Sequence, residues 1–197
     1  MSEADDVAEE LYKINSAWKG HENFATWLVN YKQPKVIVDL GMDYGFSTFV
    51  FAIPKIGIVY GVDWFQEDQQ TPWNTYDSVI EKQKLFKKKF GVEIVVIKGD
   101  SRVVCSTWSE KIDILHIDAM HIYDYVKSDY ENWSKFVNED GVILLHDVNS
   151  CFTDVCKYFQ EIKEPKGIFL HSHGLGVISK NKDMLSKIKE KFNDFQI

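Results

Sequence analysis

Short runs of branched apolar residues alternate along this chain with segments of helical period. The runs lie at residues 36–40, 57–62, 93–98, 112–117 and 142–146. Between most of them, apolar residues recur every three or four positions, as they do on one face of a helix. Buried strands separated by helices are typical of a parallel sheet that is covered on both faces. The pattern therefore predicts an α/β fold with a doubly wound, Rossmann-like sheet.

Three apolar stripes predict helices that pack against this sheet. They comprise Val7, Leu11, Ile14 and Trp18; Phe24, Trp27, Leu28 and Tyr31; and Ile122, Val126, Tyr130, Trp133 and Val137. Another helix is expected around Thr153–Ile162. After it, two strand-like runs at 167–171 and 174–179 flank the tripeptide SHG, which predicts an antiparallel hairpin at the sheet edge. The sheet is thus expected to have seven strands, mostly parallel.

The length and composition favour one domain. The chain has 197 residues, of which 45% are hydrophobic, and no repeat or Gly/Ser/Pro-rich linker divides it. We expect a single domain over residues 1–197, with N-terminal helices in 1–32, the core in 33–180 and a C-terminal helix in 181–197.

The net charge and the cysteine content limit which binding partners and which cellular compartment we expect. A net charge of -7 argues against binding nucleic acid through its phosphates. No apolar run is long enough to span a membrane, and the acidic start MSEADDVAEEL does not resemble a signal peptide. The three cysteines form no CxxC pair, so we expect reduced thiols and a cytoplasmic location. A homo-oligomer is compatible with all of this.

Polar residues follow each of the five expected parallel strands. In a doubly wound sheet, ligands bind at these carboxyl ends, near the point where the strand order reverses. The residues concerned are Asp39, Gly41, Asp43, Gly45 and Ser47 after the first strand; Asp63 and Trp64 after the second; Asp100 and Ser101 after the third; Asp118 and His121 after the fourth; and His146 and Asp147 after the fifth.

The turn VDLGMDYGFST, residues 38–48, bears on which cofactor could bind. A dinucleotide fingerprint has the form GxGxxG, but here Asp43 replaces the second glycine and would repel a pyrophosphate. S-adenosylmethionine has no phosphate and carries positive charge. Asp63 is placed to accept ribose hydroxyls from either cofactor. The turn alone leaves an ordinary strand-to-helix corner open.

Taken together, the motifs resemble the class I S-adenosylmethionine-dependent methyltransferases. They are VDLGMDYGFST, GVDWF, KGDS, IDILHIDAMHIYDYVKSDYENWSKFVNEDGVILLHDV and HSHGLGVIS, within about residues 20–180. The long block is similar to the small-molecule O-methyltransferase signature hIDGxHxYxxVxxDxxxWxxxLxxGGhhhxHD. The chain departs from the family pattern at Asp43, at Ala119 and Met120, and at Asp140.

The resemblance implies a role for each strand end. Asp39, Gly41, Gly45 and Ser47 would surround the methionine portion of S-adenosylmethionine. Asp63 and Trp64 would hold the ribose, Asp100 and Ser101 the adenine, and Asp118 would lie near the methyl donor. An aspartate before a serine is also a common helix N-cap, so capping by Asp100 stays open.

Two devices could activate the acceptor hydroxyl. The resemblance implies a divalent ion such as Mg²⁺ or Mn²⁺, and Asp118, His146 and Asp147 are candidate ligands, although His146 suits Mg²⁺ poorly. Alternatively, His121 acts as a general base. His116 is expected to be a hydrogen-bonded core residue, and His171 and His173 to be surface residues beside the substrate. The stretch TPWNTYDSV, 71–79, either covers the cofactor or begins a helix.

The function expected from the resemblance is methylation of a hydroxyl on a small molecule or sugar. The alternatives are a dinucleotide-binding oxidoreductase, which the glycine pattern disfavours, and a non-catalytic member that only binds the cofactor.

Overall fold

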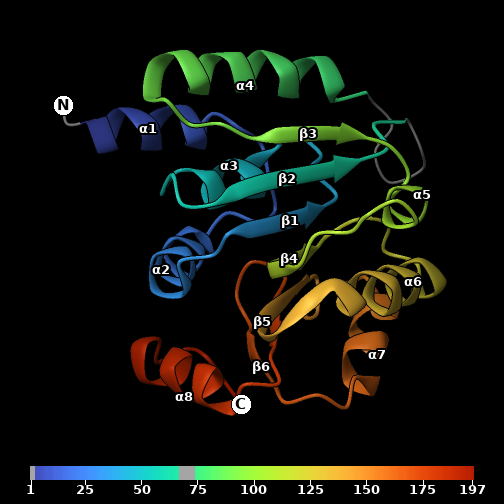
Figure 1. The fold of residues 1–197 in the computed structure, drawn as a ribbon. Coiled ribbons are helices and arrows are strands. Elements are labelled where there is room, and N and C mark those ends of the chain that lie inside the picture. Colours follow the sequence, from blue (N-terminus) through green and yellow to red (C-terminus); the bar gives the residue numbers. More distant parts are fainter. Residues whose placement is uncertain (1–2, 67–73) are drawn as a thin grey trace.

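A computed structural model describes residues 3–66 and 74–197 and contains a mixed sheet of seven strands (Figure 1). The strand order is β3-β2-β1-β4-β5-β7-β6. The first five strands pair in parallel, whereas β7 is antiparallel to both β5 and β6. The predicted Rossmann-like sheet with a C-terminal hairpin is confirmed. The strands are β1 (Val36–Leu40), β2 (Ile58–Asp63), β3 (Val95–Lys98), β4 (Ile112–Ile117), β5 (Val137–His146), β6 (Lys166–Phe169) and β7 (Leu175–Ile178).

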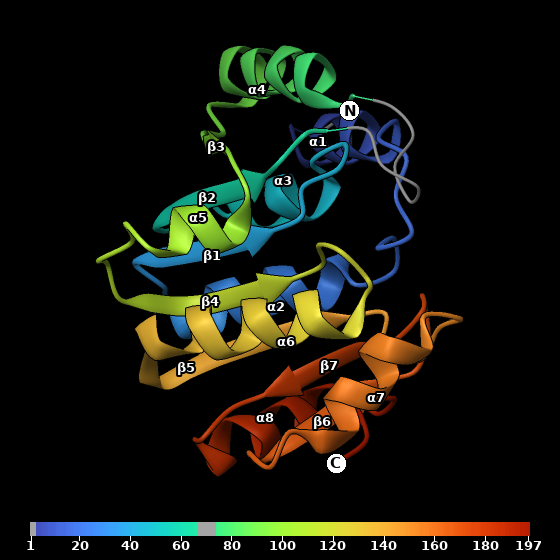
Figure 2. The ribbon, with the colours of Figure 1, turned by 90° about the vertical axis from the view of Figure 1, so that its right-hand side faces the viewer.

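Helices cover both faces of this sheet, and Figure 2 shows α5 and α6 in front of it and α2 behind. One apolar core contains side chains of α1 (Glu3–Tyr12), α2 (Glu22–Lys32), α3 (Phe46–Ala52), α4 (Tyr76–Phe90) and α8 (Lys182–Lys191). The other contains side chains of α5 (Ser101–Cys105), α6 (Tyr123–Trp133) and α7 (Thr153–Glu161). Strand residues alternate between the cores, so that Ile37 joins the first and Val38 the second. Within the described ranges, no helix has the length and apolarity needed to cross a membrane.

Two of the predicted helical stripes extend beyond their helices. The helix α1 ends at Tyr12, and Ile14 and Trp18 lie in the turns after it, although both are buried. The helix α6 ends at Trp133 and is followed by a short 3-10 helix, η1 (Ser134–Phe136). Val137 therefore begins β5, which starts earlier than the expected residue 142, and it pairs with Ile112 across a register irregularity. Val137 continues the helical spacing, and spacing alone does not separate a helix from a strand here.

Other expectations fail at element ends, where side chains turn outward. Tyr31 and Ile122 are 50% and 45% exposed, so the prediction that they face the core is wrong. The C-terminal helix stops at Lys191, and Gln196 returns to bridge Ile168 of β6. In the stretch TPWNTYDSV, residues 71–73 lie outside the described residues, and α4 begins at Tyr76.

Candidate functional site

A cavity of about 530 Å³ opens where the carboxyl ends of the parallel strands meet. The strand order reverses between β1 and β4, which is the position expected for a ligand site in such a sheet. Most of the predicted site residues line this cavity: Gly41, Ser47, Asp63, Trp64, Asp100, Ser101, Asp118, His121, His146 and Asp147. Asp39 and Gly45 are not among the lining residues.

The glycine turn after β1 brings the backbone close to β4. Gly41 has a φ of +89°, and a Cβ atom there would lie 2.1 Å from the carbonyl oxygen of Asp118. Only glycine fits this close approach. Gly45, with a φ of +86°, precedes the first turn of α3. The turn thus places Gly41 and Ser47 in the cavity wall beside Asp118.

Asp39 supports this wall from behind. Its side chain is fully buried and accepts hydrogen bonds from the hydroxyls of Ser47 and Thr48 at 2.8 and 2.5 Å. It also accepts one from Nδ1–H of His116 at 2.6 Å. The Nε2 atom of His116 in turn accepts from the indole N–H of Trp18 at 3.0 Å. His116 is therefore confirmed as a hydrogen-bonded core residue. Trp18 lines the cavity.

Asp63 shapes the wall at the end of β2. Its carboxylate accepts hydrogen bonds from the backbone N–H groups of Asp43, at 2.9 Å, and Phe65, at 2.6 Å. Burial raises the pKa of Asp63, against the effect of these N–H donors. Trp64 is 46% exposed and stands at the cavity edge.

The end of β3 provides a capped helix start. Asp100 accepts the backbone N–H of Arg102 at 2.9 Å, so the N-cap reading is confirmed. The Arg102 guanidinium beside it holds the pKa of Asp100 below its usual range. Ser101 donates its hydroxyl to Asp129 of α6 at 2.6 Å. Asp129 is only 2% exposed, and burial raises its pKa to about 6.

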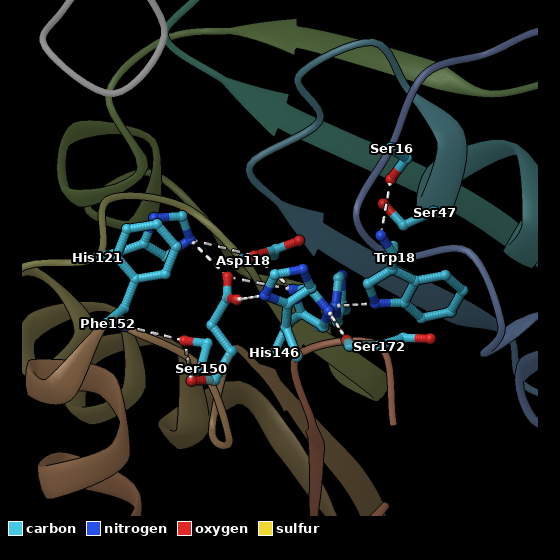
Figure 3. A network of polar contacts seen from close by, with 12 residues as sticks. Ser16, Trp18, Ser47, Asp118, His121, His146, Ser150, Phe152 and Ser172 are labelled. Carbon is cyan, nitrogen blue, oxygen red and sulfur yellow. Dashed lines mark hydrogen bonds and ion pairs between the residues drawn. The ribbon is translucent and has the colours of Figure 1, made fainter. Parts of the chain in front are cut away.

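Two aspartates and two histidines, Asp118, His121, His146 and Asp147, meet near the ends of β4 and β5. Figure 3 shows the first three side by side. Nε2 of His121 lies 3.4 Å from Asp118 and 3.0 Å from Asp147. Nδ1 of His146 lies 3.2 Å from Asp118 and 3.3 Å from Asp147, while its Nε2–H donates to the carbonyl of Ser172 at 3.0 Å. The ring of His121 also stacks on Phe152 at 4.1 Å.

These contacts control the charges of the cluster. Burial disfavours protonated histidine, but the carboxylates of Asp118 and Asp147 outweigh it and raise the pKa of His121 to about 9. The same balance raises the pKa of His146 to about 10. Burial would raise the pKa of Asp118 and of Asp147, yet the histidines hold both below the usual range. The two carboxylates therefore favour the doubly protonated, positively charged form of both histidines.

The residues that could hold a metal ion differ from the predicted set. Ligand atoms of Asp118, His121 and Asp147 lie within 4.8 Å of one another. His146 is not part of that group, although its Nδ1 lies beside both carboxylates, and its Nε2 is bonded to the Ser172 carbonyl.

Several lining residues were missed from the sequence. Trp18, Tyr125, Asp129 and Phe152 line the cavity, and so does His173, which the sequence predicts to lie beside the substrate. Asp129 occupies the aspartate position of the YxxVxxD spacing, so the sequence contained a signal that this residue belongs to the site. His173 is half-exposed, with Nδ1 3.8 Å from Asp147, whereas His171 pairs with Asp194 at 3.3 Å and is not among the lining residues.

The chain was compared with known proteins. Residues 38–148 match the sequence model of a family described as a methyltransferase domain. An uncharacterised protein, y4gI of Sinorhizobium fredii, is 31% identical over 193 residues; the match covers 88% of this chain and 20% of that protein. The chain thus spans about a fifth of the length of this curated relative.

Solved structures show the same fold. One is a methyltransferase of Podospora anserina, PaMTH1, with a TM-score of 0.65 and 14% identity over 91% of this chain and 88% of that one. Another is the O-methyltransferase of Bacillus cereus, with a TM-score of 0.62 and 15% identity over 91% of each chain. Both of those proteins were crystallised with S-adenosylhomocysteine.

Proposed function

The chain belongs to the methyltransferase-domain family, and we propose that it transfers a methyl group from S-adenosylmethionine to a hydroxyl of a small molecule or sugar. The solved structures named above, which include an O-methyltransferase and hold the demethylated cofactor, support the donor and the reaction type.

The charge of the cavity wall carries this proposal. Six aspartates line the cavity, and neither lysine nor arginine is found among its described lining residues. The aspartates are Asp43, Asp63, Asp100, Asp118, Asp129 and Asp147. The protonated His121 and His146 also line the cavity, but their charges are balanced by Asp118 and Asp147. The remaining aspartates repel the pyrophosphate of a dinucleotide, whose binding needs N–H donors or cations. The wall accommodates a donor with a sulfonium and an ammonium group, and so the oxidoreductase alternative is disfavoured.

The proposed placement of the donor follows the strand ends. The methionine portion lies against Gly41 and Ser47, with Gly45 shaping the turn between them and Asp39 fixing the Ser47 hydroxyl from behind. The ribose hydroxyls face Asp63 and Trp64. The adenine lies near Asp100 and Ser101, and Asp129 stands beneath Ser101. The methyl group then points toward Asp118.

Methyl transfer requires the acceptor oxygen to lie in line with the sulfur–methyl bond and to lose its proton. The cluster at Asp118 and Asp147 is the part of the cavity wall that is suited to hold that hydroxyl. His121 can serve as a base only after giving up the proton that both carboxylates stabilise on it. As it stands, it orients the carboxylates.

The donor set of Asp118, His121 and Asp147 fits a divalent cation. Two carboxylates and an imidazole favour Mn²⁺ or a later transition ion over Mg²⁺, which prefers oxygen ligands throughout. Bound there, such an ion would lower the pKa of the acceptor hydroxyl and orient it. We therefore propose Asp118, His121 and Asp147 as the metal ligands, with His146 behind them.

The cellular setting also belongs to this proposal. All three cysteines are free thiols, which supports a reducing, cytoplasmic location. A homo-oligomeric state stays a prediction.

The decisive experiment has two stages. Calorimetry with S-adenosylmethionine and with NAD is expected to detect binding of the first alone. Production of S-adenosylhomocysteine is then measured with a panel of sugar and phenol acceptors. Binding of NAD in place of S-adenosylmethionine would overturn the proposal. Binding without turnover on any acceptor would favour the non-catalytic alternative.

A further inference from the structure

Asp43 has an unusual backbone for its residue type. Its φ is +45°, in the left-handed region that favours glycine. In the methyltransferases that the chain resembles, the usual residue at this position is glycine, which would adopt the conformation at no steric cost. Aspartate tolerates the conformation better than most residues, but still at a cost. A side chain that adopts this conformation in a cavity wall suggests a role for that side chain.

The carboxyl of Asp43 lies between the proposed ribose and methyl subsites. Its backbone N–H donates to Asp63 at 2.9 Å, and its carboxyl is close enough to both Asp63 and Asp118 to be repelled by them. All three side chains line the same cavity, and Asp43 is exposed into it. Desolvation within the cavity, followed by the charge of Asp63, raises the pKa of Asp43 to about 6.

The lysine that attracts Asp43 leaves this charge largely uncompensated. Lys82 attracts Asp43 weakly from α4, but its amino group is hydrogen-bonded to the hydroxyl of Ser78 and lies over the ring of Tyr44. No ion pair to Asp43 is formed within the part of the chain that the structure describes. A carboxylate crowded by two others is stabilised by a cation that enters the cavity.

We propose that Asp43 faces the sulfonium of bound S-adenosylmethionine and makes the site prefer this cationic donor over its neutral product, S-adenosylhomocysteine. The inference rests on the proposed function. The sulfur joins the ribose side of the donor, placed at Asp63, to the methyl group, placed at Asp118. A carboxylate flanked by both aspartates therefore faces the sulfur.

The transfer itself removes the attraction. The sulfur–methyl bond breaks with its electron pair going to sulfur, while a lone pair of the acceptor oxygen forms the oxygen–methyl bond and the hydroxyl proton passes to water. The product sulfur is neutral. The Coulomb attraction to Asp43 is thus present in the donor complex and absent in the product complex, which favours exchange of product for donor.

Calorimetry on three ligands tests this inference. They are S-adenosylmethionine, S-adenosylhomocysteine and sinefungin, which carries an ammonium group in place of the methyl sulfonium. Asp43→Asn keeps the size and the tolerance of the left-handed backbone, and Asp43→Gly restores the family residue. Both are expected to weaken binding of the two cationic ligands about tenfold and to change binding of S-adenosylhomocysteine less than about twofold. Asp183→Asn, which removes an equal charge from the exposed start of α8, is expected to change none of the three affinities.

The outcomes separate the two proposals. Equal losses for all three ligands, or no loss for the cationic pair, would overturn the role of Asp43 while leaving the proposed function standing. A wild-type protein that binds neither S-adenosylmethionine nor S-adenosylhomocysteine would overturn the proposed function and the inference with it.

Discussion

Replacing Asp63 by alanine probes both the ligand contact and the shape of the cavity wall. In the structure, one carboxylate oxygen accepts the backbone N–H of Phe65 and the other that of Asp43. The variant therefore loses the proposed bonds to the ribose and also releases two amides of the wall. Hydrogen bonds to a charged group contribute about 1.5 to 3 kcal/mol, so we expect S-adenosylhomocysteine to bind about 10 to 150 times more weakly.

The two effects are measured separately. Because water can reach the released amides from the open cavity, we expect the free energy of unfolding to fall by only about 1 to 3 kcal/mol, as measured in urea. Calorimetry with S-adenosylhomocysteine then reports the ligand contact in a protein that is still folded. Asp63→Asn keeps one acceptor oxygen but turns an N–H toward a backbone N–H, and its affinity should lie between those of the wild type and the alanine variant. A folded Asp63→Ala protein with wild-type affinity would refute the ribose role.

Three further predictions concern the metal, the buried network and pH. EDTA should abolish methyl transfer but change the affinity for S-adenosylhomocysteine less than about twofold, because Asp118, His121 and Asp147 are proposed to face the acceptor. Turnover that survives EDTA but is lost in His121→Ala would show that a histidine base acts in place of a metal ion. His116→Ala removes a hydrogen-bond partner from both the buried Trp18 indole and the buried Asp39 carboxylate. The free energy of unfolding, measured in urea, should therefore fall by about 3 to 5 kcal/mol. A loss below about 1 kcal/mol would contradict a stabilising role for this hydrogen-bond network. Burial raises the pKa of folded Asp129, which lies near Asp100 and Arg102, to about 6. Between about pH 4 and pH 6 this residue therefore holds a proton that the unfolded chain has released, and the free energy of unfolding falls as pH rises through this range. Asp129→Asn should therefore gain stability relative to the wild type across that range, and a difference in unfolding free energy that is flat with pH would exclude the assignment.

The sequence alone was sufficient for the sheet and for the edge where the site lies. Burial periodicity is a local property, and it places a strand at Val36–Leu40 and ends it at the glycine turn. Once the strands are parallel, their carboxyl ends must lie together, so the convergence of Asp63 and Asp118 on one cavity follows. The alternation of side chains along β1 also indicates which face of the sheet Asp39 occupies. Asp39 shares the parity of Ile37, which places it on the α3 face, behind the cavity and not in it.

The tertiary structure alone decided which side chains meet. His121 and His146 both lie near strand ends, and their sequence positions do not show which groups their ring nitrogens meet. The structure pairs the Nε2–H of His146 with the carbonyl of Ser172, which lies 26 residues beyond it, while Nε2 of His121 lies beside Asp118 and Asp147. Likewise, the partner of His116 is Trp18, 98 residues away, in a turn and not on the expected helix. Buried polar side chains need hydrogen-bond partners, and packing brings only a few donors and acceptors within reach of each one. Which partners meet depends on distances between residues that are far apart in the sequence, and a local sequence pattern does not contain those distances.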